Sequence, residues 1–490
     1  MPAKNLLPEN FLRGRAFAPA ALAFLLLWSC SRQTQQATTP IEPHLSYVLS
    51  IPSVDTIHVS ATVTPDDRRG PVQILFPPFD ADNPVITFRG NNIHNLKLTD
   101  ASIDDSLRME PWLGDSVQSL LVNSAAASFS IDYDVTFPYD PNGSPTLKTI
   151  LPGKYGAAEG YFQGNYVFCV PAYGATKALW WRRSIDCRVS LAKPVAGTVH
   201  GVPTQPFPCY TIYELFFLQW AISDRVTDCG SFGQGASIVV LSANEPPPDV
   251  PSLICEDLTV IDSFCHGVFP QLLAPRTVIL QDSGDGMEGT FSFYMINRQG
   301  NDYTSYSRPI TAHEGLHAWI GIRCGDLDDP WWKEGTASYF GRVLGVNLGF
   351  PKDTVRPTIV KDLKGNPMIE QRAMSDPFVR DHLYDKDANV NCAALVYDKG
   401  GQTCMILDKI IRGATGNTAT LFSKTGELCT RYDHTGFSRG QFKALLEENT
   451  GLDLTGFFAS YVDGVGVIDT ATLASAWRFV DSCGAFNGKP

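Results

Sequence analysis

The segment His313–His317, with the sequence HEGLH, holds chemically active residue types at a metal-binding spacing. Histidines four residues apart lie on one face of an α-helix with Cβ atoms about 5 to 6 Å apart, so both imidazoles can bind one Zn²⁺ at about 2.0 to 2.1 Å. Glu314 lies about 100° further round the helix, where its carboxylate can hydrogen-bond a water on the metal. The spacing predicts His313 and His317 as zinc ligands and Glu314 as the general base. The alternative interpretation is a surface helix with incidental histidines.

Glu334, in the segment WWKEGTASYF, is the candidate third ligand. A catalytic zinc ion takes three protein ligands and keeps one position open. A carboxylate on the next helix, 17 residues beyond His317, completes such a set. Trp331 and Trp332 are expected to pack the start of that helix and hold the carboxylate in place. Taken alone, a glutamate before a glycine indicates the solvated start of a helix, but beside HEGLH we interpret it as a ligand.

Four motifs follow one another in the order found in a known family. They are HEGLHAW at 313–319, KEGTASYF at 333–340, LVYDKGGQTCMILDKIIRGATG at 395–416 and FFASYVDGVG at 457–466. Together they resemble the glycyl aminopeptidase family of gluzincin zinc metallopeptidases, which is related to the aminopeptidase N and leukotriene A4 hydrolase group. No PDZ domain, which members of the family often carry, is recognisable. The resemblance implies a thermolysin-like catalytic domain with one zinc ion held by His313, His317 and Glu334.

The resemblance also implies roles for Tyr397 and Glu288. Tyr397 matches the tyrosine of the family's YDKG motif, whose phenol would donate a hydrogen bond to the oxyanion formed at the peptide carbonyl. Glu288, in the segment GDGMEG at 284–289, matches the residue that binds the substrate's free α-amine. That amine has a pKa of about 7.7 to 8 and is mostly ammonium at pH 7, so a carboxylate there selects chain ends. The alternatives are a core tyrosine and an acidic residue in a surface turn.

The chain departs from the family pattern close to these residues. Gly289 stands where a histidine usually follows the glutamate, and Ile320 stands where an asparagine usually follows the tryptophan. The interval from His317 to Glu334 is shorter than usual, and we expect the loop at 325–330 to absorb the difference.

Two kinds of local pattern must position these residues. From about residue 44 apolar residues alternate with period two, as from Ile57 to Val63, and strand-like runs continue to about residue 195. Residues 44–195 are therefore predicted to be a β-rich N-terminal domain, an antiparallel β-sandwich. Residues 196–490 are predicted to form the thermolysin-like zinc peptidase domain, with a mixed sheet lobe followed by a helical C-terminal lobe. The fold class is α+β multidomain.

Local signals support the second region. Strands are predicted at Thr277–Leu280 and Thr290–Asn297, on either side of GDGMEG. Ser438 and Gln441 have the spacing of a helix capping box, ahead of a helical apolar pattern.

The composition excludes some classes of partner. The chain has 490 residues, of which 44% are hydrophobic, so it can bury a large core and form two to three domains. Its formal net charge is -12, and it has no basic run longer than two residues. This pattern gives no electrostatic footprint for nucleic acid. The sequence does not predict an oligomeric state.

Residues 1–30 have the layout of a lipoprotein signal peptide. Basic residues precede an apolar run at Ala16–Trp28, and the closing LLWSC resembles the lipobox of bacterial lipoproteins, which implies a lipid on Cys30. An ordinary cleaved leader is the alternative. Residues 31–43 are polar and predict a flexible tether. We therefore expect an exported lipoprotein of a bacterial cell envelope, anchored to the membrane on its periplasmic or cell-surface face.

Besides Cys30 the chain has 11 cysteines, and no two have C-x-x-C spacing. Export permits disulfides, and Cys255 with Cys265 is one candidate pair. An odd number leaves at least one thiol free.

The function predicted from these observations is a zinc-dependent aminopeptidase. It would hydrolyse N-terminal peptide bonds of short peptides through a zinc-activated water, with Glu314 as the general base. Two alternatives remain. One is a zinc endopeptidase of the same fold, which would not need Glu288. The other is a catalytically silent surface lipoprotein that serves as a binding module.

Overall fold

The computed structural model describes the chain from residue 44 to residue 486, with gaps. The described residues are 44–53, 56–65, 71–76, 93–103, 108–112, 115–124, 126–136, 160–164, 167–172, 184–192, 199–200, 207–222, 225–229, 236–241, 249–271, 276–281, 292–296, 303–325, 329–383 and 392–486. The predictions for Cys30, for the tether at 31–43 and for Glu288 lie outside these residues. Residues 42–490 form one compact unit.

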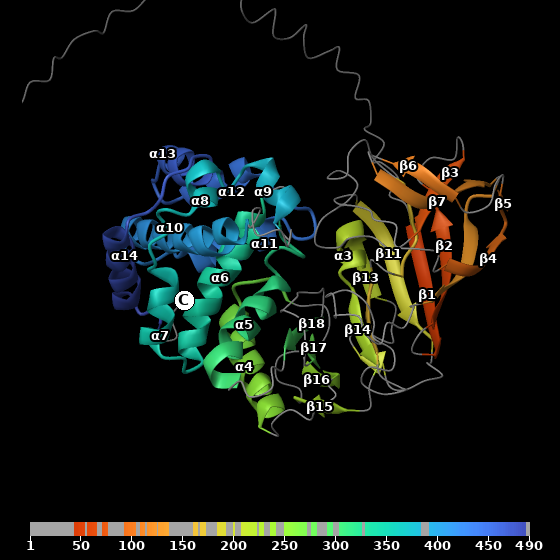
Figure 1. The fold of residues 1–490 in the computed structure, drawn as a ribbon, viewed down its shortest axis with the longest axis horizontal. Coiled ribbons are helices and arrows are strands. Elements are labelled where there is room, and N and C mark those ends of the chain that lie inside the picture. The colour runs from red at the N-terminus through yellow and green to blue at the C-terminus, as the bar shows by residue number, and fades with distance from the viewer. Residues whose placement is uncertain are drawn as a thin grey trace, which may run out of the picture. The chain divides into compact units, whose positions relative to one another are not determined.

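Alternating apolar residues build a six-stranded sheet, in the order β13-β11-β1-β2-β8-β4. In β2 and β8 every second side chain is buried, because one face of the sheet covers the core and the other faces out. Figure 1 shows β1, β2 and β11 side by side, and β1 pairs with β2 antiparallel and with β11 parallel. The strands are β1 (His44–Ser53), β2 (Thr56–Thr64), β4 (Ile93–Thr99), β8 (Phe129–Thr136), β11 (Ser184–Leu191) and β13 (Phe207–Thr211).

A second sheet shares its hydrophobic core with the first. Phe76 of β3 contacts Tyr133 of β8 with ring centroids 5.4 Å apart, and both side chains are buried in one cluster. The strands of this sheet are β3 (Val72–Phe76), β5 (Ser102–Ile103), β6 (Arg108–Trp112), β7 (Asp115–Asn123) and β10 (Val170–Pro171). A smaller sheet contains β9 (Gly160–Gln163), β12 (Val199–His200) and β14 (Gln219–Ile222), and helix α3 (Ile212–Phe216) directly follows β13.

A four-stranded mixed sheet lies beside helix α4 (Val250–Cys265). Its order is β15-β16-β17-β18, with β15 antiparallel to β16 and the other pairs parallel. The strands are β15 (Val226–Asp228), β16 (Ala236–Leu241), β17 (Arg276–Gln281) and β18 (Ser292–Ile296), so the strands predicted at Thr277–Leu280 and Thr290–Asn297 correspond to β17 and β18. One face of the sheet packs its apolar side chains against α4.

A disulfide between Cys229 and Cys255 ties the residue after β15 to α4. The predicted pairing of Cys255 with Cys265 is therefore wrong. Both of these cysteines lie on α4, and ten residues of helix separate them by about 15 Å, far beyond the reach of a disulfide. Cys265 is a buried free thiol.

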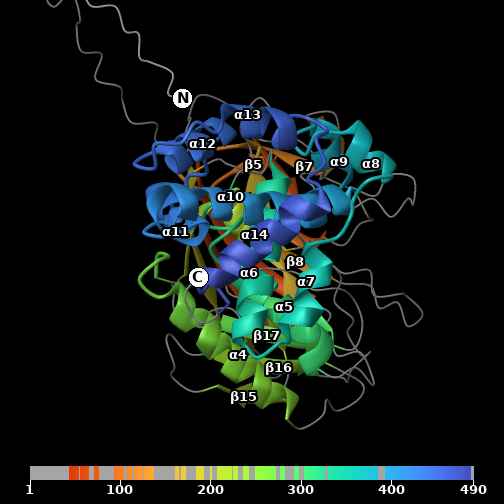
Figure 2. The same ribbon diagram turned by 90° about the vertical axis from the view of Figure 1, so that its left-hand side faces the viewer.

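The described residues from 303 onward are mainly helical and surround their own large core. Figure 2 shows α10 and α14 crossing, with α6 and α5 below them. The helices are α5 (Tyr303–His317), α6 (Pro330–Asn347), α7 (Lys352–Ile359), α8 (Pro367–Gln371), α9 (Pro377–His382), the π-helix η3 (Ala394–Lys399), α10 (Gly400–Thr415), α11 (Leu421–Arg431), α12 (Arg439–Glu447), α13 (Thr455–Phe457), the π-helix η4 (Phe458–Val462) and α14 (Thr470–Ser482). The capping box predicted at Ser438 and Gln441 begins α12.

The prediction of an α+β fold with a mixed sheet followed by a helical C-terminal part is confirmed. Within the described residues, no helix combines the length and the apolar character that crossing a membrane requires.

Candidate metal centre

Helices α5 and α6 bring three candidate ligands to one point. The Nε2 atoms of His313 and His317 are 3.0 Å apart, and Glu334 Oε2 lies 3.3 Å from the first and 3.4 Å from the second. Within the described part of the chain, no other three His, Cys, Asp or Glu side chains gather their ligand atoms this closely. The structure therefore places together the three residues that the two motifs indicated.

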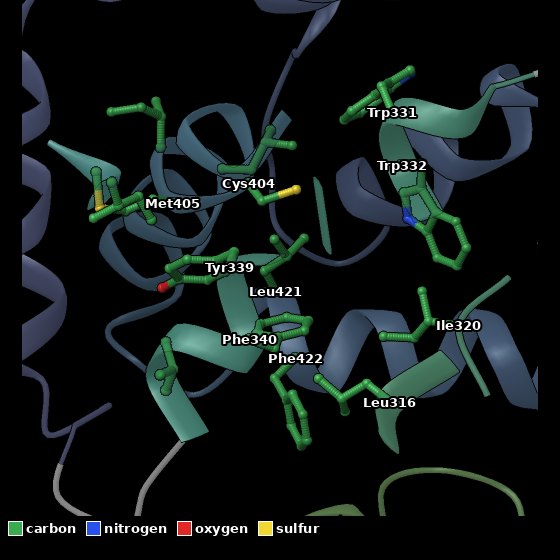
Figure 3. Close-up of a cluster of buried hydrophobic side chains, with 14 of the residues drawn as sticks. Leu316, Ile320, Trp331, Trp332, Tyr339, Phe340, Cys404, Met405, Leu421 and Phe422 are labelled. Atoms are coloured by element: carbon green, nitrogen blue, oxygen red, sulfur yellow. The ribbon is translucent and has the colours of Figure 1, made fainter. Parts of the chain in front are cut away.

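Packing at the start of α6 fixes the position of Glu334. Pro330 occupies the first turn, where a missing N–H costs nothing. Before it, Asp329 accepts two hydrogen bonds from Arg439, at 2.6 and 2.9 Å. Trp331 and Trp332 are buried, and both indole rings contact Phe442. Figure 3 shows the two indoles at the first turn of the helix. The first turn of the helix is therefore packed within a cluster of aromatic side chains, as expected from the sequence.

The backbones of α5 and α6 approach closely beside the first histidine. A Cβ atom on Gly341 of α6 would lie 3.1 Å from the amide nitrogen of His313 and 3.2 Å from its Cα. From the other side, the buried Arg276 of β17 donates a 3.2 Å hydrogen bond to the carbonyl of Gly315. The ligand-bearing turn of α5 is therefore held between the mixed sheet and α6.

Backbone and hydroxyl groups orient the two imidazoles. The Nδ1–H of His317 donates to the carbonyl of Ile320 at 2.9 Å, because a carbonyl only accepts. In the neutral ring, which is the form that binds a metal, the lone pair is therefore on Nε2. The hydroxyl of Ser338, one turn after Glu334, lies 3.5 Å from Nδ1 of His313. The orientation of both rings leaves their Nε2 atoms facing Glu334.

Burial and charge set the ionisation of the group. Burial opposes ionisation of Glu334, but the Lys333 ammonium and the two histidines hold the pKa of its carboxyl well below the usual range. Burial alone would lower the pKa of His317, yet the Glu334 carboxylate outweighs it and raises that pKa to about 8. Burial lowers the pKa of His313. The site thus combines an ionised carboxylate with two buried histidines, of which His317 is the more basic.

These distances and donors fit a zinc ion. A tetrahedral zinc with bonds of about 2.0 to 2.1 Å keeps its ligand atoms about 3.3 to 3.4 Å apart. The three observed separations are 3.0, 3.3 and 3.4 Å. Two nitrogens and one carboxylate oxygen are also the ligand set of catalytic zinc sites that leave a fourth position open. His313, His317 and Glu334 are therefore the residues that would hold the metal.

Glu314 and Tyr397 border this group. Glu314 is buried, and its carboxylate is close enough to His317 to help raise the pKa of that imidazole. The ring of Tyr397 lies with its centroid 5.9 Å from that of His313. Tyr397 belongs to η3, and π-helical turns occur frequently at functional sites.

A contact between two glycines sets the distance from η3 to the ligand helix. A Cβ atom on Gly335, the residue after Glu334, would lie 2.6 Å from the carbonyl carbon of Gly400. Gly400 directly follows η3, so the backbones of α6 and α10 touch there. The distance from Tyr397 on η3 to the three ligands is therefore fixed by a direct backbone contact, because neither glycine has a side chain to separate the two helices.

Sequence reasoning missed three contributors to this centre. The Ile320 carbonyl gives no signal, because every residue has one. Lys333, whose Nζ is 3.5 Å from Glu334 Oε1, and Ser338, four residues after Glu334, stand in the motif KEGTASYF but had no assigned role. A helical count from Glu334 would have placed Ser338 on the face of α6 that meets α5.

The fold around the three ligands is that of the aminopeptidase N and leukotriene A4 hydrolase group of metallopeptidases. An aminopeptidase N family protein from Idiomarina loihiensis has a TM-score of 0.64 at 15% identity, over 88% of this chain and 78% of that chain. An M1 zinc metallopeptidase from Deinococcus radiodurans has a TM-score of 0.55 at 14% identity, over 88% and 96%. Leukotriene A4 hydrolase from Saccharomyces cerevisiae has a TM-score of 0.53 at 13% identity, over 89% and 70%.

The sequence resemblance at the level of this group is thus confirmed in the fold, and the narrower likeness to glycyl aminopeptidases stays a prediction. No family model matches the chain, and no curated protein sequence matches it.

Proposed function

We propose that the chain is a zinc-dependent aminopeptidase that removes N-terminal residues from short peptides. The convergence of His313, His317 and Glu334 ligand atoms within 3.0 to 3.4 Å of one another, beside Glu314, carries the proposal. The similarity in fold to metallopeptidases of known type supports it. When bound, a zinc ion acts as a Lewis acid towards the peptide carbonyl and lowers the pKa of water.

The chain's own side chains supply the proton transfers. Glu314, next to the ligands, takes the proton of the attacking water and delivers it to the leaving amine. The Tyr397 phenol donates a hydrogen bond to the oxygen that gains charge at the peptide carbonyl. Lys333 keeps Glu334 ionised and therefore ready to bind a cation.

Selection of chain ends is assigned to Glu288. This assignment comes from the segment GDGMEG, and its basis is the pairing of a substrate ammonium with a carboxylate. An internal peptide bond offers no cation and would leave that carboxylate unpaired.

The test is cleavage of free-amine and N-acetylated alanyl and glycyl peptides, with and without a zinc chelator. Cleavage of free-amine peptides only, abolished by the chelator, is the expected result. Equal cleavage of acetylated peptides would indicate an endopeptidase and remove the role of Glu288. Bound zinc without cleavage of either substrate would contradict the enzyme and favour a binding module. Glu288→Gln is the matched variant: it should raise KM for free-amine peptides and leave bound zinc unchanged.

We also propose that the chain is an exported lipoprotein held at the cell envelope by Cys30. The support is the LLWSC segment at its junction with a polar stretch. Mass spectrometry of the N-terminal peptide should show a diacylglyceryl group on Cys30. Cys30→Ala should move the protein from the membrane fraction to the soluble fraction, and an unmodified Cys30 in the exported protein would contradict the proposal.

A further inference from the structure

A tight turn follows the zinc-ligand helix and supports His317. The Ile320 carbonyl in this turn accepts the Nδ1–H of His317 at 2.9 Å. The turn is closed by two backbone hydrogen bonds, from Gly321 to the Cys324 carbonyl at 2.7 Å and from Cys324 to the Trp319 carbonyl at 3.0 Å. Gly321 has a φ of +101°, which a side chain would disfavour. The position of Ile320, and with it the orientation of His317, depends on this turn.

The same turn packs against the C-terminal end of α11. Arg323 makes two hydrogen bonds to the Asp433 carboxylate, at 2.9 and 2.5 Å. The amide of His434 donates to the Arg323 carbonyl at 2.8 Å. Through these contacts residues 319–324 pack against the segment that begins at Cys429.

Cys324 and Cys429 meet at this junction. The thiol of Cys429, on α11, lies 4.0 Å from the Trp319 carbonyl, the group that also accepts the Cys324 amide. Both side chains are fully buried. The Cys324 thiol is also close enough to Cys429 to raise the pKa of its thiol. Two thiols that are 105 positions apart in the chain (429 − 324) are thus neighbours in a dry core.

Both thiols are free in the structure. We propose that under oxidising conditions Cys324 and Cys429 form a disulfide bond that fixes the turn behind His317. The chain already contains one disulfide, Cys229–Cys255, so its cysteines do pair. A disulfide-bearing oxidant, such as glutathione disulfide or a thiol oxidoreductase, would accept the electrons. One S–S bond forms between Cys324 and Cys429, the oxidant's S–S bond breaks, and two electrons and two protons pass to its two thiols.

The bond would form while the chain folds. Burial, together with the neighbouring Cys324 thiol, raises the pKa of Cys429 well above its usual range in the folded protein. Since the thiolate is the reacting species, exchange at this place is slow once the core has closed. The same burial then protects the finished bond from reduction.

The disulfide has a consequence for the metal, which rests on the proposed zinc site. Cross-linking the turn to α11 limits the movement of the Ile320 carbonyl, and a fixed acceptor keeps the lone pair of His317 Nε2 aimed at the ligand position. Loss of the bond therefore weakens zinc binding without removing any ligand.

Peptide mapping tests the bond itself. The full chain is exported through an oxidising compartment, alkylated without reduction, digested and analysed by mass spectrometry, using preparations in which Cys229 and Cys255 are found joined. We expect a peptide pair linked through Cys324 and Cys429 that separates on reduction. Alkylating label on both cysteines overturns the proposal, as does a link from Cys429 to the nearby Cys265.

Zinc affinity tests the consequence, by competition with a chromophoric chelator. Cys324→Ser and Cys429→Ser should each weaken zinc binding about tenfold, the low end of the cost of losing an orienting group. The double variant should be no weaker than either single variant, because all three lose the same bond. The matched control, Cys265→Ser, places a hydroxyl in the same core and should stay within about twofold of the parent.

The outcomes separate this inference from the proposed function. Additive losses in the double variant, or an equal loss in Cys265→Ser, overturn the link between the bond and the zinc site. A linked parent chain that binds no zinc supports the disulfide and contradicts the zinc peptidase. A parent that binds zinc and cleaves peptides with both thiols alkylated supports the peptidase and overturns the disulfide.

Discussion

Strand β8 and helix α6 both contribute side chains to a hydrophobic core, but they are buried to different extents. In β8 buried and partly exposed side chains alternate along the whole strand. In α6, 14 of 18 residues are buried, and they include the charged pair Lys333 and Glu334. A strand with one free face tolerates change at every second position. A helix surrounded on nearly all sides makes contacts at almost every position, and α6 uses them to hold a carboxylate in place.

The largest expected effect is at Glu314, the proposed general base on the buried helix α5. Glu314→Gln keeps the size and burial of the side chain on α5 but removes its capacity to take a proton. We expect kcat to fall by about 10² to 10⁴-fold, with the melting temperature and bound zinc unchanged. Steady-state kinetics, thermal unfolding and metal analysis measure the three quantities. Full activity in this variant would show that another residue is the base.

Tyr397→Phe tests the residue that faces the ligands from η3. Loss of one donor to the developing oxyanion should lower kcat by about 10² to 10³-fold with little change in KM. The measurement is kcat and KM on a free-amine peptide, with zinc content as the control. A rise in KM with kcat preserved would instead place the phenol in substrate binding.

Gly335→Ala tests whether the crossing of α6 and α10 tolerates a side chain. The added Cβ would meet the Gly400 backbone at 2.6 Å, so we expect a loss of about 1 to 3 kcal/mol in unfolding free energy. Gly345→Ala, on the same helix, is the matched control. Its nearest neighbour is Pro309 at 3.6 Å, an ordinary contact, and it should be stabilising by about 0.5 to 1 kcal/mol. Denaturant unfolding compares the two, and equal effects would break the argument.

The smallest expected effect lies in β8. Ile131 faces the core and Ser130 faces away from it. Ile131→Val should cost about 0.5 to 1.5 kcal/mol of unfolding free energy, whereas Ser130→Ala should stay within about 0.5 kcal/mol of the parent. A comparable loss at both positions would mean that the outer face of the sheet is also covered.

Sequence reasoning worked where the physical cause is local. The alternation in β2 follows from one-sided burial, and HEGLH needs only one turn of helix to bring its histidines together. Glu334 was reachable because a three-ligand zinc site calls for one more carboxylate. The roles of Glu314, Tyr397 and Glu288 stay predictions.

Features that depend on distant segments were not visible. The contact of Gly335 with Gly400 joins residues 65 positions apart (400 − 335), and the Ile320 carbonyl carries no residue-type signal. Cysteine pairing failed for the opposite reason. Cys255 and Cys265 are close in sequence, but both lie on α4, and the length of helix between them keeps them too far apart to bond. Cys255 instead bonds Cys229, which the fold brings beside α4.

The contact of Gly335 with Gly400 also limits how the proposed enzyme can be re-engineered. Where two side chains meet, a larger one on one side can be offset by a smaller one on the other, so the spacing of two helices can be tuned in small steps. Here backbone meets backbone, and neither residue has anything left to remove. A library of variants that seeks new substrate preferences therefore cannot shift η3 relative to α6 gradually by changing these two glycines. Its substitutions should be placed at residues that do not alter the contact between α6 and α10.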